Sequence, residues 1–260
     1  MGYLFFDESI HTRGDFILGA WVYCESDPAP AVDAALLASG LRPGIDEFKS
    51  GDRMADQPSF QKLRESLWDA LFGSPNRVGL VVIPSKARPR LGVEALVALK
   101  KFVTANGLAS ESLSAFMDEG LFTSVERAER EALALGLFPR VAIRVEQDSR
   151  TVPGLQLADM VAHASSTLLL ARMGLVTKTV KARPMSGFSP NEDLELAYTL
   201  RAGLRFTFFH RPKPEFDPGT RPDSWVEVAD YGLHLSDDVP DDLRGAVIEC
   251  FGRAWHGCIR

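Results

Sequence analysis

Three apolar runs in this chain each lead to an aspartate. The runs and their aspartates are residues 3–6 with Asp7, residues 114–117 with Asp118, and residues 141–145 with Asp148. Short runs rich in aromatic and branched residues are typical of buried strands. If the three strands are parallel neighbours, their carboxyl ends meet at one edge of the sheet, where open α/β sheets bind ligands. Because clustered carboxylates repel one another, the pattern predicts a site for a divalent cation.

The remaining pattern alternates between strands and helices. We expect further strands at residues 16–24, 78–83 and 225–235, and helices at residues 31–39, 60–72, 93–103, 125–135, 155–173, 194–204 and 243–255. The polar segment from Ser9 to Gly14 predicts a hairpin that pairs residues 3–7 antiparallel with residues 16–24. Strands that alternate with helices from residue 78 onward predict right-handed crossovers and parallel neighbours.

The helix expected at residues 155–173 is apolar almost all round, so it should be buried. Gln156, Asp159 and His163 are its polar exceptions, and their i, i+3, i+7 spacing places them on one stripe. A buried aspartate costs free energy unless it has a partner or an ion. Hydrogen bonds from a loop, or an arginine, would explain Asp159 alone equally well. With three other aspartates expected at the same edge, a bound ion becomes the better explanation.

Length and composition are those of an ordinary globular protein. The chain has 260 residues, 45% of them hydrophobic, which is enough for a sizeable core. We expect a core domain at residues 1–175 with a helical insert at about residues 25–76, and a C-terminal extension at residues 176–260. The extension should pack on the core or on a second subunit, so a homodimer is one expected assembly. A net charge of −6 argues against broad adhesion to nucleic acid, although it permits a local basic strip.

The chain has no apolar stretch of membrane-spanning length and no basic, then apolar, leader, so we expect a cytoplasmic protein without a membrane partner. Its three cysteines form no CxxC pair, which suits free thiols in a reducing compartment. Cys250, His256 and Cys258 could share a metal. Ordinary packing is the favoured explanation for three candidates on one short segment.

Several motifs resemble a known family. They are residues 6–9 (Phe-Asp-Glu-Ser), residues 48–50 (Phe-Lys-Ser), residues 148–150 (Asp-Ser-Arg) and residues 155–159 (Leu-Gln-Leu-Ala-Asp). With the order of elements, they resemble the ribonuclease H-like fold and, more narrowly, the domain-of-unknown-function family numbered 3800, over roughly residues 2–205. The resemblance implies an α/β fold with a ribonuclease H-like mixed sheet flanked by helices. It also implies a metal-dependent phosphodiesterase activity, which for that family is itself inferred from the fold.

The place of the glutamates is open. The ribonuclease H pattern has a glutamate on the first crossover helix, for which Glu94 is the nearest candidate by position and Glu47 in the insert competes. Glu8 and Glu119 directly follow aspartates and should point to the opposite side of an extended strand, so we leave them out of the site. Ile10 stands where the family has glycine, which changes the turn more than the chemistry.

Phosphodiester hydrolysis needs charge neutralised on the phosphate oxygens and hydroxide near neutral pH, and two divalent ions can supply both. On this hypothesis Asp7 bridges two Mg²⁺ or Mn²⁺ ions, Asp118 binds one of them, and Asp159 or Asp148 binds the other. The expected substrate is DNA or RNA. A two-metal nuclease is therefore the leading interpretation.

Other polar residues have supporting roles in this hypothesis. Lys49 would orient the attacking water or clamp a phosphate, although a single loop lysine is more often simply solvated. His163 would shuttle protons, or form a local hydrogen-bonding pair. Ser149 and Gln156 would orient the carboxylates from behind.

A basic strip follows the candidate catalytic helix. Lys178, Lys181 and Arg183 could track a phosphate backbone, while a solvated loop is the default for so short a run. Residues 205–211 mix phenylalanine with arginine and histidine, for which a strand with one buried face is favoured over a base-stacking surface. The runner-up function is a non-catalytic ribonuclease H-like module that binds nucleic acid or a protein. An ATP-binding protein finds no support, because the chain lacks a GxxxxGK[ST] loop.

Overall fold

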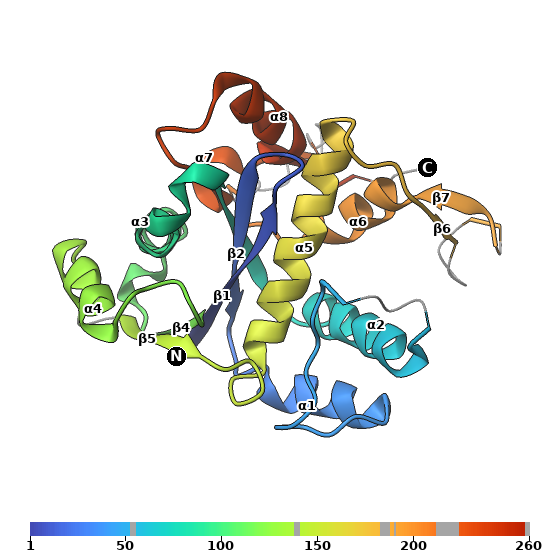
Figure 1. Cartoon of the computed structure of the whole chain (residues 1–260), viewed down its shortest axis with the longest axis horizontal. Coiled ribbons are helices and arrows are strands. Elements are labelled where there is room, and N and C mark those ends of the chain that lie inside the picture. Colours follow the sequence, from blue (N-terminus) through green and yellow to red (C-terminus); the bar gives the residue numbers. More distant parts are fainter. Residues whose placement is uncertain (53–55, 138–140, 183–187, 190, 212–223, 258–260) are drawn as a thin grey trace, which may run out of the picture.

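A mixed six-stranded sheet runs through the molecule in the order β5-β4-β1-β2-β3-β9 (Figure 1). The computed structural model describes residues 1–52, 56–137, 141–182, 188–189, 191–211 and 224–257. The strands of this sheet are β1 (Gly2–His11), β2 (Phe16–Cys24), β3 (Arg77–Pro84), β4 (Leu113–Asp118), β5 (Val141–Gln147) and β9 (Leu233–Leu235). Helices cover both of its faces, so the protein is α/β, as the sequence predicts.

The three aspartate-bearing strands lie side by side in parallel, which is the arrangement that the predicted site requires. The strand at β3, expected as a parallel neighbour of β4, pairs with β2 and β9 instead. β1 is parallel to β4, with Phe6 opposite Met117, and β4 is parallel to β5. β1 also forms the predicted antiparallel hairpin with β2. However, β1 continues to His11, opposite Phe16, so the expectation that it ends at Asp7 is wrong. Backbone pairing with β2 continues this strand beyond the apolar run of residues 3–6.

Two layers of helices flank the sheet. The helices are α1 (Ala29–Ala38), α2 (Pro58–Phe72), α3 (Leu91–Ala105), α4 (Val125–Ala134), α5 (Gly154–Arg172), α6 (Leu196–Leu204), α7 (Ala229–Gly232) and α8 (Asp241–Phe251). Apolar residues of α3 and α4 pack on one face of the sheet, and those of α1, α2, α5 and α8 pack on the other. Within the described parts of the chain, we find no helix with the length and apolarity needed to cross a membrane.

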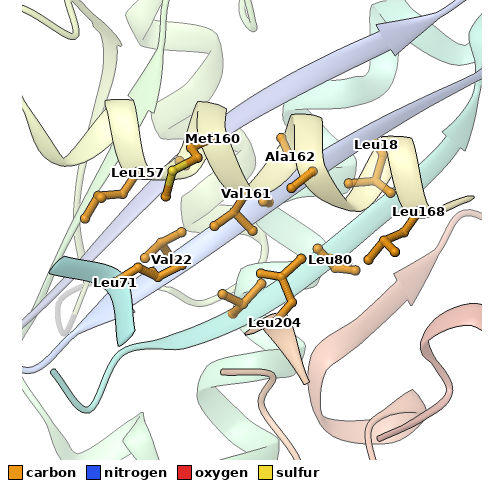
Figure 2. Close-up of a cluster of buried hydrophobic side chains, with 14 of the residues drawn as sticks. Leu18, Val22, Leu71, Leu80, Leu157, Met160, Val161, Ala162, Leu168 and Leu204 are labelled. Carbon is orange, nitrogen blue, oxygen red and sulfur yellow. The ribbon is translucent and has the colours of Figure 1, made fainter. Parts of the chain in front are cut away.

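The buried helix α5 fixes the position of the polar residues that it carries. Figure 2 shows Val161 and Leu168 of α5 packing toward Val22 and Leu80 of the sheet. Complete burial of side chains of this size stabilises a fold by about 1.5–3 kcal/mol each. Several such contacts therefore hold α5 firmly in place.

α5 runs along β1 in the same direction. At its start, a Cβ added to Gly154 would lie 2.5 Å from the Phe5 ring, so only glycine permits this close approach. Near its end, Leu170 would lie 3.1 Å from a Cβ at Gly14, in the turn after β1. Residues in the middle of β1 and of α5 consequently face each other.

The C-terminal extension differs in detail from its prediction. Residues 205–211 do not form a strand, and a single bridge joins Phe208 to Val78. Residues 225–235, expected as one strand, divide into β8 (Trp225–Glu227), α7 and β9. The last helix ends early, and β10 (Arg253–Trp255) pairs with β8, while β6 (Thr179–Lys181) pairs with β7 (Asp193–Glu195). The domain division at residue 175 stays a prediction, and β9 of the extension extends the main sheet.

Candidate functional site

Asp7 and Asp118 lie together where β4 ends beside β1. Because Phe6 is opposite Met117, the next residue of each strand points to the same face of the sheet. Asp7 is only 7% exposed. Burial raises the pKa of Asp7 well above its usual value, and repulsion from Asp118, Asp159 and Glu8 adds to the rise. These groups are therefore close enough to act on one another.

Asp159 approaches the same place from α5. It accepts a hydrogen bond of 2.7 Å from the backbone N–H of Ser50 and a second from the Ser50 hydroxyl. Burial raises the pKa of Asp159, while the Ser50 hydrogen bonds and the Lys49 ammonium partly oppose that rise. Asp159 thus carries negative charge toward the site and also anchors the insert.

Glu8 is a residue of this site that the sequence analysis left out. Burial raises its pKa from 4.5 to about 7, with a further rise from Asp118 and an opposing effect from Arg88. Its Oε2 atom is buried without a hydrogen-bond partner among the described residues. Glu8 does alternate to the other face from Asp7, but β4 ends at Asp118 and leaves the edge beside Glu8 open. Two features could have identified Glu8. It is an acidic residue directly after the strand aspartate, and the neighbouring strand is shorter than its own.

The insert places Lys49 near the carboxylates, and its role toward a water or a phosphate stays a prediction. Its Nζ atom lies 3.5 Å from Oε2 of Glu47. Burial lowers the pKa of Lys49, but Glu47, Asp118, Asp7 and Asp159 outweigh burial and raise it. The ammonium group therefore belongs to the electrostatics of this cluster, while 45% of the Lys49 side chain stays exposed to solvent.

Ser149 and Gln156 support the insert. The Ser149 hydroxyl donates to Glu47. The fully buried Gln156 accepts a 2.8 Å bond from the N–H of Phe48 and donates a 3.1 Å bond to the carbonyl of Ser149. Ser149 and Gln156 thus orient the segment that carries Lys49. Glu47, the glutamate that competes with Glu94 for a place in the site, lies beside Lys49. None of these hydrogen bonds reaches the three aspartates.

Asp148 has a local partner instead. Arg150 makes an exposed ion pair with it at 2.6 Å and donates its backbone N–H at 2.8 Å. Hydrogen bonds from the Arg150 side chain lower the pKa of Asp148 to about 2. The structure engages this carboxylate with Arg150, and its proposed role as a metal ligand stays a prediction without geometric support.

His163 lies in the middle of α5, and Lys178 and Lys181 follow this helix in the chain. Burial lowers the pKa of His163, and the charge of Lys178 lowers it further, so the basic strip begins close to this ring. Lys181 forms an exposed ion pair of 2.8 Å with Asp193. Arg183 lies outside the described residues.

Two other sequence candidates are placed elsewhere. Oε2 of Glu94 in α3 accepts a hydrogen bond of 2.8 Å from Nε2 of His234, and α3 packs on the opposite face of the sheet from α5. Cys250 is buried with its sulfur 3.8 Å from the Arg201 side chain, and Cys258 lies outside the described residues. Of the two candidate glutamates, Glu94 and Glu47, it is therefore Glu47 that lies beside the candidate site.

The donor set consists of carboxylate oxygens, which suit Mg²⁺ or Mn²⁺. As the side chains stand, the described residues include no group of three or more His, Cys, Asp or Glu that could hold a metal ion. No protein-family model matches the sequence, and no curated protein matches it significantly. The function of this protein is therefore inferred from its fold and from the geometry of the site.

Proposed function

We propose that this protein is a ribonuclease H-like, divalent-metal-dependent nuclease or related phosphodiesterase. Asp7, Asp118 and Asp159 would hold Mg²⁺ or Mn²⁺. The observation that carries the proposal is the buried Asp7 carboxylate, which three further carboxylates repel while only the N–H of Glu8 donates to it among the described residues. A divalent cation is the ligand that would remove this repulsion.

The position of β1 supports the ribonuclease H-like assignment. β1 lies inside the sheet, antiparallel to β2 and parallel to β4. Asp7 on this central strand, Asp118 on β4 and Asp159 on α5 converge from three elements. Convergence from separate elements is what a site at the carboxyl edge of parallel strands requires.

Each side chain has a role in this proposal. Bound cations would acidify a coordinated water and neutralise charge on the phosphate. Asp7 is the central ligand because the other carboxylates all act on it, and Asp118 and Asp159 hold the cations from either side. Their side chains would turn toward a shared cation from their present positions. Lys49, beside Glu47, would bring an ammonium group to the scissile phosphate of DNA or RNA.

Thermal unfolding with Mn²⁺ tests the cation site without a substrate. A ligand that binds only the folded state stabilises it by about 2.7 kcal/mol at 100 times its dissociation constant. Mn²⁺ should therefore raise the melting temperature of the wild-type protein, but much less that of Asp7→Asn. Asp148→Asn is the matched control and should respond as wild type does. An equal response of wild type and Asp7→Asn would contradict the proposal.

The second candidate is a non-catalytic module that binds nucleic acid or a protein, with carboxylates kept for structure. The two hydrogen bonds from Ser50 to Asp159 favour it, because they give that carboxylate a purely structural task. On this alternative, Asp159→Asn destabilises the fold by about 1–3 kcal/mol through loss of an acceptor. Mn²⁺ would then leave the melting temperature of the wild type unchanged. A homodimer stays a prediction for either function.

A further inference from the structure

Beyond Asp7, β1 forms an open edge of the sheet. Its parallel pairing with β4 stops at Phe6, while its pairing with β2 continues to His11. Asp7, Ser9 and His11 alternate onto the same face of the strand. This is the face along which α5 runs, since Phe5, two residues before Asp7, contacts Gly154.

A second polar cluster follows the carboxylates along this edge. His163 lies four residues after Asp159, and hence on the same side of α5. Its ring centroid is 6.3 Å from that of His11, with the rings inclined at 41°. Nε2 of His11 is 2.9 Å from the hydroxyl of Ser9. The two histidines and Ser9 therefore form a row that continues from Asp7 and Asp159.

Two basic side chains act electrostatically on His163, and His163 in turn acts on His11. Lys178 and Arg64 are the charged groups that act on His163, and both are basic. Among the described residues, neither imidazole has a carboxylate as a hydrogen-bond partner or in an ion pair. Burial also lowers the pKa of His11 to about 4, so this ring is neutral at neutral pH. His11 and His163 therefore lack an anionic partner, although nearby positive charge favours the binding of one.

The donors of this cluster suit an oxyanion better than a metal. A neutral imidazole has one N–H donor, and the Ser9 hydroxyl can supply another. Two imidazoles could also ligate a transition metal, but no set of three suitable ligands exists in the described parts of the chain. A phosphate group with several acceptor oxygens is the better match.

We propose that Ser9, His11 and His163 bind a backbone phosphate of the nucleic-acid substrate. The substrate class rests on the proposed function, whereas the oxyanion site does not. Four residues cover about 13 Å along a strand and about 6 Å along a helix. The distance from the carboxylates to the histidines thus corresponds to roughly two to four nucleotides, at a rise of about 3.4 Å per nucleotide along the axis of a duplex. One nucleic-acid strand can place one phosphate at the carboxylates and another against the two histidines.

Histidine side-chain NMR tests the oxyanion site directly. The full chain, labelled with ¹⁵N-histidine and kept in chelator, is titrated with inorganic phosphate. The imidazole signals of His11 and His163 should shift and saturate, while those of His234, held by Glu94, should stay in place. Unchanged His11 and His163 signals would overturn the proposal.

A thymidine pentanucleotide without terminal phosphates separates a backbone phosphate from free phosphate. In Asp7→Asn with chelator, where neither cleavage nor cation binding is expected, this probe should shift the same two histidines. His11→Asn and His163→Asn introduced into that background should each weaken its binding at least tenfold, with His234→Asn as the matched control. A response to inorganic phosphate alone would refute the assignment to the nucleic-acid backbone.

The same histidine variants distinguish this inference from the proposed function. In the otherwise wild-type chain, His11→Asn and His163→Asn should retain the full rise in melting temperature with Mn²⁺. If Mn²⁺ has no effect on wild type but inorganic phosphate still shifts both histidines, the cation site is wrong and the oxyanion site stands. If Mn²⁺ stabilises wild type and neither probe shifts the histidines, the oxyanion site is wrong.

Discussion

Asp7 and Asp148 look alike in the sequence, because each follows an apolar run that forms a strand. In the structure they have opposite environments. Asp7 is buried among other carboxylates, which together with burial raise its pKa, whereas Asp148 is paired with Arg150, which lowers its pKa to about 2. An aspartate after an apolar run is thus a strong candidate for a cation site only when no nearby cationic side chain already balances its charge.

The position of the strand in the sheet explains this difference. β1 is an interior strand, covered by α5, whereas β5 is at the edge of the sheet. The end of β5 is therefore exposed, and Arg150 can reach back two residues to Asp148 in the following turn. Asp7, by contrast, is followed in the chain by Glu8, another carboxylate whose repulsion raises the pKa of Asp7. The comparison between the Asp7 cluster and the Asp148 turn can be tested by matched substitutions.

Loss of metal-dependent cleavage should be the largest difference. Removing a residue that merely orients a metal ligand typically costs 10–100-fold in metal affinity or activity, so loss of the central ligand should cost more than about 100-fold. Asp7→Asn should therefore reduce Mn²⁺-dependent cleavage of a DNA and RNA panel by at least this factor. Asp148→Asn should cleave as wild type does. Comparable losses in both variants would remove the distinction between the two regions.

The pH dependence of stability should be the next largest effect, measured by urea unfolding in chelator. Because the folded-state pKa of Glu8 is raised from 4.5 to about 7, the folded protein holds this proton more tightly than the unfolded chain. Stability should consequently fall as pH rises through that window. Glu8→Gln should flatten the fall and gain up to about 3 kcal/mol at pH 8, at about 1.36 kcal/mol per pKa unit.

Asp7→Asn should raise stability at neutral pH in chelator for the same reason, because the amide cannot ionise. A lower melting temperature for both Glu8→Gln and Asp7→Asn would instead show that the carboxylates are structural acceptors. Asp148→Asn provides the comparison. The pKa of Asp148 is lowered rather than raised, so this variant should show no gain in stability.

The support of the insert should have an intermediate effect. Gln156→Leu would leave the N–H of Phe48 and the carbonyl of Ser149 without their present partner, at a cost of about 1–3 kcal/mol. Urea unfolding should show this loss. Faster proteolysis within residues 40–52 would locate it in the insert, whereas unchanged stability would mean that the insert does not depend on this amide.

The ion pair of Asp148 should have the smallest effect. Its folded-state pKa is lowered, so its contribution is present above the ordinary pKa of 3.8 and is lost as pH falls toward about 2. Because the pair is exposed, Asp148→Asn should cost less than about 1 kcal/mol at pH 7, and high salt should remove the difference. A larger, salt-independent loss would mean that Asp148 has a buried role.

Much of this architecture could be predicted from local patterns. The alternation of apolar runs and helical stripes located strands β1 to β5 and helix α5, and the Pro153-Gly154 turn before α5 marked its start. The alternation of strands and helices from residue 78 onward predicted the parallel pairing of β4 with β5, whereas the parallel pairing of β1 with β4, which aligns Asp7 with Asp118, was a condition of the predicted site. Periodicity is informative here because burial of one face imposes it on the sequence.

The sequence by itself determined which residues could form the sheet and which carboxylates could gather at its edge. Only the tertiary structure decided that Asp148 turns to Arg150, that Glu8 belongs with Asp7, and that His11 faces His163. The reason is physical. Local patterns record whether a side chain is apolar or polar, but the charge that it meets depends on elements distant in the sequence. The lengths of β1 and β4, and the path of α5 along β1, decide those encounters.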